Sequence, residues 1–257
     1  MRLALVSDVH GRIEGLREAG RAADLFICLG DLLLFMDYDD PALGIFADLH
    51  GEQKAREFIA LRTANRWDEA RELSNRLWTE LGGDTRSTIT AAVRLQYAQV
   101  FEAMPGGLLT YGNVDVPSLW PDYLRDDHTV VDGSVVEVDG LRIGLVGGGL
   151  PSPMRTPYEI PEDEFDAKLR AIGAVDVLCS HIPPALPETT YDVKARRFER
   201  GSKGLLDAIR QWQPRYVLHG HVHSPLTPRQ RIGRTEIINV GHFRSRRAPY
   251  VIDISPR

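Results

Sequence analysis

The sequence predicts an α/β fold in which short buried strands alternate with helices. Short apolar runs recur along most of the chain, and their length is typical of buried strands. The first two runs, residues 3–6 and 25–29, flank a stretch at 13–22 that reads as a helix. This β-α-β order favours parallel strands joined by a right-handed crossover.

Further apolar runs predict the remaining strands. In chain order these runs lie at residues 108–111, 135–138, 141–146, 175–179, 216–218, 235–240 and 250–254. The runs 135–138 and 141–146 are separated only by Asp139 and Gly140, the residue pair that favours a tight hairpin turn. A helix is predicted at 162–172. Another is predicted to be capped by Ser202 and to end at Trp212, before Pro214.

Residues from about 37 to 105 interrupt this pattern. Apolar residues such as Val93, Tyr97 and Val100 recur there at helical spacing, and strand signals are almost absent. We therefore expect one domain over residues 1–257 with a helical insertion at about 37–105.

Composition narrows the class of partner. The 257 residues are 43% hydrophobic and carry a formal net charge of -5, which argues against a general nucleic-acid-binding protein. A nucleotide substrate stays open, because bound metals supply local positive charge. Cys28 and Cys179 lie in apolar runs and are expected as buried, reduced thiols. The apolar run near the N-terminus is too short for a signal peptide or membrane span, so no membrane association and a cytoplasmic location are expected.

Motifs with metal-binding residue types directly follow five of the predicted strands. They are Asp8-Val9-His10, Gly30-Asp31, Gly112-Asn113-Val114-Asp115, Ser180-His181 and Gly220-His221-Val222-His223. Ligand sites in α/β sheets collect beyond the carboxyl ends of the strands, so these segments are expected to converge. Imidazole and carboxylate groups suit divalent Mn, Fe or Zn. One carboxylate can bridge two such ions about 3.5–4 Å apart.

This ordered set resembles the calcineurin-like metallophosphoesterase family, whose pattern is D-x-H, G-D, G-N-H-D/E, H and G-H-x-H. The resemblance spans nearly the whole chain except residues 37–105. It implies a four-layer αββα sandwich of two mixed β-sheets flanked by helices. It also implies two divalent metal ions, the first held by Asp8, His10, Asp31 and His223, and the second by Asp31, Asn113, His181 and His221.

One position departs from the family pattern. Val114 stands where many members have a histidine that stabilises the phosphoryl group or protonates the leaving group, and the acid that orients this histidine is kept as Asp115. A small or hydrophobic residue here is typical of the phosphodiesterase-like branch. His242 lies where such relatives often have a short loop near the metals, and it is a candidate acid.

The remaining expectations concern roles and partners. Asp31, Asn113 and His242 are predicted to be catalytic, and Asn113 with Arg244 to bind substrate. His50 and His128 are expected at the surface. The predicted function is hydrolysis of phosphodiesters by a water or hydroxide activated by two metals. A phosphomonoesterase acting on nucleotides or phosphoproteins is the first alternative, and a non-catalytic scaffold is the second. The expected partner is a small phosphate ester, with a nucleotide as one candidate, and the helical insertion offers a surface for self-association.

Overall fold

A computed structural model describes residues 1–21 and 23–255. The chain divides into two compact units, of which one is Leu33–Gln99 and the other is formed by the chain before and after it. The second of these contains both large sheets.

The first sheet has the strand order β13-β1-β2-β3-β4. Its strands are β1 (Arg2–Val6), β2 (Leu25–Cys28), β3 (Gly107–Leu109), β4 (His128–Val130) and β13 (Tyr250–Asp253). β1, β2, β3 and β4 run parallel, and β13 pairs antiparallel with β1. The carboxyl ends of the parallel strands therefore lie at one edge of this mixed sheet.

The second sheet has the order β11-β12-β10-β7-β6-β5. Its strands are β5 (Ser134–Val138), β6 (Leu141–Val146), β7 (Val177–Ser180), β10 (Tyr216–His219), β11 (Arg229–Ile232) and β12 (Thr235–Asn239). β6, β7, β10 and β12 are parallel, and the two edge strands are antiparallel to their neighbours.

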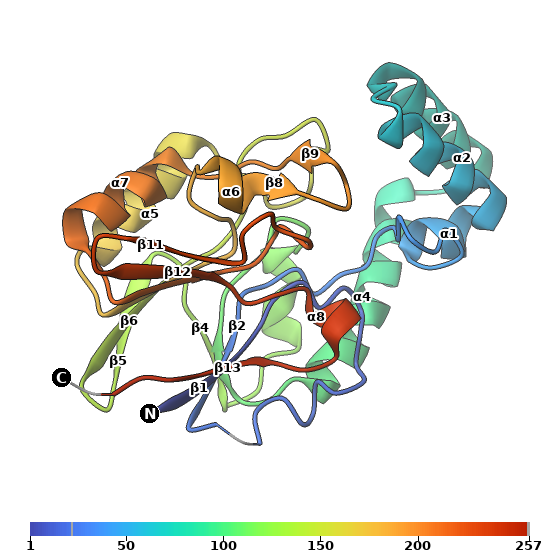
Figure 1. The fold of residues 1–257 in the computed structure, drawn as a ribbon. Helices are drawn as coiled ribbons and strands as arrows, with labels where there is room; N and C mark the ends of the chain where they lie inside the picture. Colours follow the sequence, from blue (N-terminus) through green and yellow to red (C-terminus); the bar gives the residue numbers. More distant parts are fainter. Residues whose placement is uncertain (22, 256–257) are drawn as a thin grey trace. The chain divides into compact units, whose positions relative to one another are not determined.

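The main core lies between the two sheets. It combines Leu5 and Ile27 of the first sheet with Ile143, Val177 and Leu218 of the second, all fully buried. A second core joins the other face of the second sheet to helices α5 (Glu162–Ile172) and α7 (Lys203–Trp212), which lie together in Figure 1. The predicted class, two mixed sheets flanked by helices, is confirmed.

Local signals in the sequence explain several elements. Helix α5 has the predicted bounds. The Ser202 side chain accepts a hydrogen bond from the Leu205 amide and caps α7. Asp139 and Gly140 both have positive φ, as the tight turn between β5 and β6 requires.

The helix predicted at residues 13–22 is wrong. The described part of this segment is a run of separate turns, closed by hydrogen bonds from the Leu16 amide to the Ile13 carbonyl and from the Ala19 amide to the Leu16 carbonyl. Gly15 has φ +82°, and a side chain there would meet the Arg247 carbonyl oxygen at 2.3 Å. This close approach interrupts helical geometry. Ala22, the last residue of the predicted helix, lies outside the described residues.

The compact unit Leu33–Gln99 is helical. It contains α1 (Ile45–His50), α2 (Glu52–Thr63), α3 (Trp67–Leu81) and most of α4 (Thr85–Ala103). Phe46 stacks on Phe58 at 4.8 Å between ring centroids, and Ala70, Leu73 and Leu77 complete its core. Helices were expected over this part of the chain. Its interpretation as an insertion in a single domain stays a prediction.

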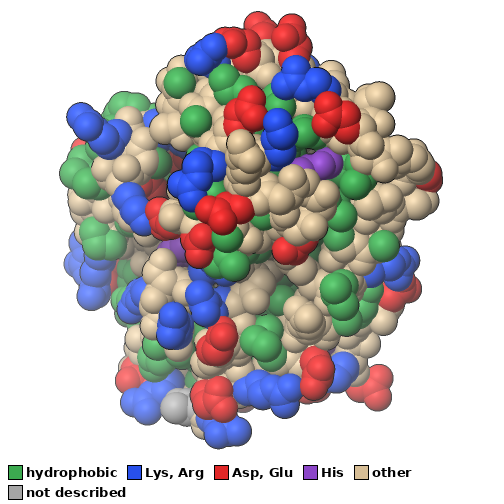
Figure 2. Space-filling model, turned by 90° about the vertical axis from the view of Figure 1, so that its right-hand side faces the viewer, with side chains coloured by type: hydrophobic (Ala, Val, Ile, Leu, Met, Phe, Trp, Pro, Cys, Tyr) green, Lys and Arg blue, Asp and Glu red, His purple; other side chains and the backbone are tan. Residues whose placement is uncertain are grey.

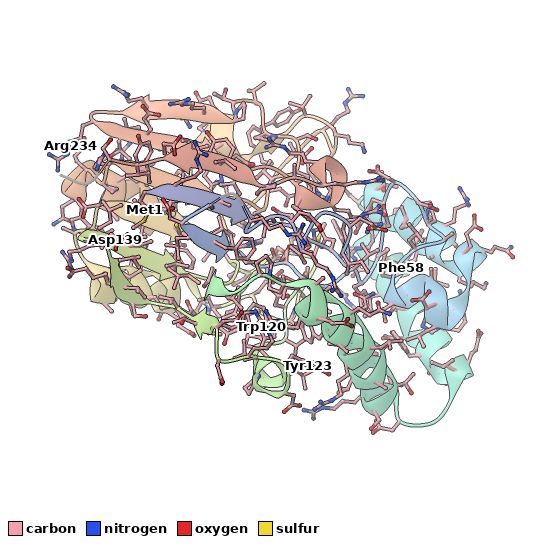
Figure 3. All side chains as sticks on the ribbon, turned by 90° about the horizontal axis from the view of Figure 1, so that it is seen from below. Met1, Phe58, Trp120, Tyr123, Asp139 and Arg234 are labelled. Atoms are coloured by element: carbon pink, nitrogen blue, oxygen red, sulfur yellow. The ribbon has the colours of Figure 1, made fainter. Side chains whose placement is uncertain are left out.

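Several short elements had no clear sequence signal. They are η1 (Pro117–Asp122), α6 (Pro187–Thr190), β8 (Tyr191–Asp192), β9 (Arg197–Phe198) and α8 (Phe243–Arg246). Figure 3 shows Trp120 and Tyr123 after β3, and both rings contact Phe101. The ring of His128 lies 5.9 Å from that of Phe101, and its side chain is buried. The expected surface position of His128 is therefore wrong, because β4 carries this residue into the fold. His50 is half-buried against Phe46 and Trp78.

Among the helices that the structure describes, none combines the length and apolar character that a membrane crossing needs.

Candidate metal centre

The predicted ligands follow the parallel strands of both sheets. Asp8, Asp31 and Asn113 come after β1, β2 and β3, while His181 and His221 come after β7 and β10. Backbone hydrogen bonds tie these loops together. The Asp8 amide donates to the Gly30 carbonyl at 3.0 Å, and the Gly220 amide donates to the His181 carbonyl at 3.0 Å.

Backbone strain is concentrated in these loops. Asp8, His10, Asp31 and His221 have φ values of +58°, +42°, +56° and +67°. Non-glycine residues seldom adopt this left-handed region, and such strain clusters at functional sites. Neighbouring glycines allow the close packing that holds these conformations. A side chain at Gly220 would lie 1.8 Å from Ser7 Oγ and 2.6 Å from Asp8 Oδ2.

A first cluster contains Asp8, His10, Asp31 and His223. Asp8 Oδ1 lies 3.4 Å from His223 Nε2 and 4.0 Å from His10 Nε2. The Nε2 atoms of His10 and His223 are 3.2 Å apart. Asp31 Oδ2 lies 3.8 Å from His10 Nε2. These donor atoms therefore face a common small volume.

A second cluster lies on the other side of the Asp31 carboxylate. Asp31 Oδ1 lies 3.5 Å from His181 Nε2, and Asn113 Oδ1 lies 3.0 Å from the same nitrogen. The rings of His181 and His221 have centroids 5.2 Å apart. Asp31, His181 and His221 each offer a ligand atom within 4.8 Å of the others. Asp31 is thus shared by both clusters.

The buried charges polarise each other. Burial works to raise the pKa of Asp31, but His181 and His10 lower it to about 2. Burial works to lower the pKa of His181, but the Asp31 carboxylate raises it to about 9. A divalent cation bound here would have to displace the proton of His181, because an imidazole binds a metal in its neutral form, while the Asp31 carboxylate is already ionised.

The donor set fits two divalent ions. Asp8 Oδ1 is buried and accepts no hydrogen bond within the part of the chain that the structure describes, an unfavourable state unless a cation takes its lone pairs. His181 Nδ1 lies 2.9 Å from the Leu29 carbonyl, which fixes the ring and leaves Nε2 to face the cluster. Imidazole, carboxylate and amide oxygen are ligands for Mn, Fe or Zn.

Asp115 has a role that the sequence pattern did not suggest. This fully buried carboxylate accepts hydrogen bonds from the backbone amides of Asp31, Leu32 and Gly112, at 2.8, 3.0 and 2.8 Å. Burial and the nearby charge of Asp31 raise the pKa of Asp115 to about 7, against the effect of these amides. Asp115 thus joins the loop after β2 to the loop after β3.

Asn113 is oriented by residues that sequence analysis missed. Its amide nitrogen donates to Thr156 Oγ1 at 3.0 Å, which leaves its oxygen directed at His181. Thr156 donates to Glu159, and Glu159 also accepts from the Ser152 hydroxyl. The sequence from Ser152 to Glu159 contains no known motif or metal-ligand spacing, so sequence patterns could not have identified these residues.

Two further polar side chains hold the histidine loops, and they too were missed. Asp192 accepts a hydrogen bond from the Ser224 amide at 3.1 Å, directly after His223. The Asn239 side chain donates to the carbonyls of Gly220 and Val222 at 3.3 and 2.9 Å. These bonds fix both sides of the segment that carries His221 and His223.

His242 and Arg244 lie beside the first cluster. The His242 ring stacks on that of His223 at 3.9 Å, and burial with the neighbouring His223 and His10 lowers the His242 pKa to about 3. Arg244 Nη1 donates to the His10 carbonyl at 2.8 Å. The guanidinium thus supports the loop that carries His10, and its predicted contact with substrate stays a prediction.

The centre is open to solvent at one side. The His223 side chain is 40% exposed, whereas those of Asp8 and His181 are buried.

Figure 2 shows one face of the molecule, on which Lys and Arg side chains are interspersed with Asp and Glu. That face is therefore not a uniformly basic surface of the kind that binds nucleic acid non-specifically.

Comparisons with known proteins agree with this geometry. A family model described as calcineurin-like phosphoesterase matches residues 1–225. One similar crystal structure has a TM-score of 0.59 and 14% identity, and the alignment covers 94% of this chain and 91% of that chain. The crystal structure of TT1561 of Thermus thermophilus has a TM-score of 0.51 and 12% identity, with 99% of each chain covered. At these identities the two structures show the shared fold alone. No curated protein sequence matches.

Proposed function

The chain belongs to the calcineurin-like phosphoesterase family, and from this premise we propose that it hydrolyses phosphodiesters with two divalent metal ions. The family and the His and Asp clusters support the phosphoesterase class. The choice of diester, the ligand assignment and the identity of the metals as Mn, Fe or Zn are our proposal.

The position of Asp31 carries this proposal. Its Oδ2 faces His10 and its Oδ1 faces His181, at 3.8 and 3.5 Å. We assign the first metal to Asp8, His10, Asp31 and His223. We assign the second to Asp31, Asn113, His181 and His221. The two histidines of each cluster come from different loops, so the fold rather than one local motif assembles the site.

Bound at these ligands, two divalent ions would lower the pKa of a water and neutralise charge on the phosphate oxygens. The chain's own residues set the geometry. Thr156 holds the amide of Asn113, and the Val114 amide donates to Asp31 Oδ1 at 2.9 Å. Asn113, at the second cluster, is the proposed contact to a phosphate oxygen, and the exposed side of His223 is the route by which substrate enters.

Val114 favours a diester over an alkyl monoester. Valine can neither donate a proton to an alkoxide leaving group nor hydrogen-bond a phosphoryl oxygen. An activated diester carries one negative charge fewer than a monoester and depends less on such a donor. His242 as an alternative acid stays a prediction from the sequence.

Two rival functions remain testable. A phosphomonoesterase would use the same centre, and its preferred substrate distinguishes it. A scaffold without catalysis would be expected to have lost ligands, whereas every ligand position of the family pattern is filled here. Cytoplasmic location, a nucleotide substrate and self-association through the helical segment stay predictions from the sequence.

We expect the native enzyme to hydrolyse diesters with higher kcat/KM than alkyl monoesters. Val114→His should raise the alkyl monoester rate relative to the diester rate by about 10-fold. This factor is smaller than the roughly 10²–10⁴ that general acid catalysis commonly contributes, because both Asp115 oxygens already accept backbone hydrogen bonds and are less able to orient the new ring. The measurement is kcat/KM for matched aryl and alkyl mono- and diesters with Mn, Fe and Zn.

Val114→Thr is the matched control, since it has nearly the shape of valine and no useful acid. It should leave the ratio of the two rates unchanged. A native preference for alkyl monoesters would contradict the assignment as a diesterase while leaving the metal assignments intact.

A further inference from the structure

The backbone of His242 is fixed against both loops of the first cluster. Asn239, three residues earlier, bonds the Gly220 and Val222 carbonyls and accepts from the Gly241 amide at 2.8 Å. Beyond His242, the Phe243 amide donates to the Ser7 carbonyl at 2.9 Å, and the Arg244 amide donates to the Asp8 carbonyl at 3.1 Å. His242 is therefore held in place by contacts on either side of it.

The side chain of His242 lies beside the same small volume as two proposed ligands. Its ring lies face to face with His223, at 3.9 Å and 6° between planes. It meets the His10 ring edge-on, with 5.7 Å between centroids. Each of the three histidines offers a ring nitrogen within 4.8 Å of the other two.

The two nitrogens of His242 have different surroundings. Nδ1 lies 2.8 Å from Ser245 Oγ. Nε2 is buried and has no hydrogen-bond partner among residues 1–21 and 23–255. A buried polar atom in this state is destabilising unless a partner takes its lone pair. Metal-binding histidines commonly engage one nitrogen in a hydrogen bond and present the other to the ion.

We propose that His242 Nε2 is an additional ligand of the first metal, beside the ligands Asp8, His10, Asp31 and His223. This inference rests on the proposed function, since it assumes that the first metal binds there. The resemblance implies two histidines at this metal, so a third is a property of this chain. Because parallel rings cannot both point at one cation, binding requires the His242 ring to turn about its χ2 bond, which has broad energy wells. An added imidazole favours Zn or Fe over Mn at this position.

The test is calorimetric titration of Zn²⁺ and Mn²⁺ into the metal-stripped protein and its His242→Phe variant. Phenylalanine keeps a flat ring over His223 and removes the nitrogen. We expect the variant to bind zinc at one of two sites at least 10-fold more weakly, since loss of a partner outside the ligand shell alone costs about 10–100-fold. Manganese affinity should change less. Ser245→Ala, which removes only the partner of Nδ1, should weaken zinc binding by a smaller factor.

His50→Ala is the control for loss of a histidine outside the centre, and its zinc affinity should match the native protein. His242→Ala is the second variant, in case the larger ring misfolds. If the His242 variants bind two zinc ions with native affinity, the inference is wrong. If these variants also hydrolyse alkyl esters more slowly, His242 is then a group that acts on the substrate and not on the metal. If the native protein binds neither metal, the proposed function itself fails.

Discussion

Asp31→Asn is expected to lower kcat for diester hydrolysis by at least about 10³-fold, which corresponds to roughly 4 kcal/mol. The substitution removes the charge that both metal positions share, since the two carboxylate oxygens face different histidine clusters. Asparagine has the same shape and tolerates the φ of +56° at this residue. Its side-chain oxygen can still accept the Val114 amide, so the loss reports on metal binding rather than folding.

His10→Ala is the comparison that distinguishes a bridging ligand from a ligand of one metal. It affects only the first cluster, so the second metal should remain bound and the fall in kcat should be smaller. Asp126→Asn, at an exposed position, is the control for a change of charge and should have native activity. Near-native turnover of Asp31→Asn with two metals bound per chain would show that Asp31 is not the bridge.

Asp115→Ala is expected to lower the free energy of unfolding by at least about 3 kcal/mol. The change leaves three backbone amides, those of Asp31, Leu32 and Gly112, without this acceptor. Each unsatisfied buried donor costs about 1–3 kcal/mol. Because whole domains are stable by only about 5–15 kcal/mol, this is a large fraction of the total. Equilibrium urea unfolding of the full chain, followed by near-UV circular dichroism, measures this change in the free energy of unfolding.

Asp115→Asn is the graded variant for this test. The single side-chain oxygen of asparagine can replace one carboxylate oxygen, but its NH₂ group then faces at least one backbone donor. The free energy of unfolding of Asp115→Asn should therefore lie between those of the native protein and Asp115→Ala. Asp126→Ala, in the exposed turn before β4, should be within about 0.5 kcal/mol of native. A stability loss for Asp115→Ala no larger than this control would mean that Asp115 does not hold the two loops together.

Most strands of the two large sheets could be predicted from the sequence, but β4 and β11 were not, because neither is a continuous apolar run. The convergence of the ligands was also predicted. Apolar runs such as residues 3–6 and 216–218 are too short for a buried helix and have the length of a strand in a sheet core, which is where they lie. Residues that follow neighbouring parallel strands of one sheet meet at one edge, as Asp8 and Asp31 do after β1 and β2. His181 follows β7 of the second sheet, so its place beside Asp31 depends on how the two sheets pack together. The Ser202 cap and the Asp139-Gly140 turn depend on local chemistry alone.

The missed features depend on contacts between distant parts of the chain. Residues 13–21 have a plausible helical pattern, yet close packing of Gly15 against Arg247 imposes turns. β8 and β9 are too short to leave a periodic pattern. The three amides bound by Asp115 and the partnerless Nε2 of His242, among the described residues, follow from tertiary geometry that no motif contains.

Anomalous X-ray scattering from crystals of the manganese-loaded protein tests the central claim most directly. The account predicts two anomalous peaks per chain, about 3.5–4 Å apart, on the two sides of the Asp31 carboxylate. One peak should lie near Asp8, His10 and His223, and the other near Asn113, His181 and His221. A single peak at full manganese saturation, or two peaks that do not share Asp31, would contradict it.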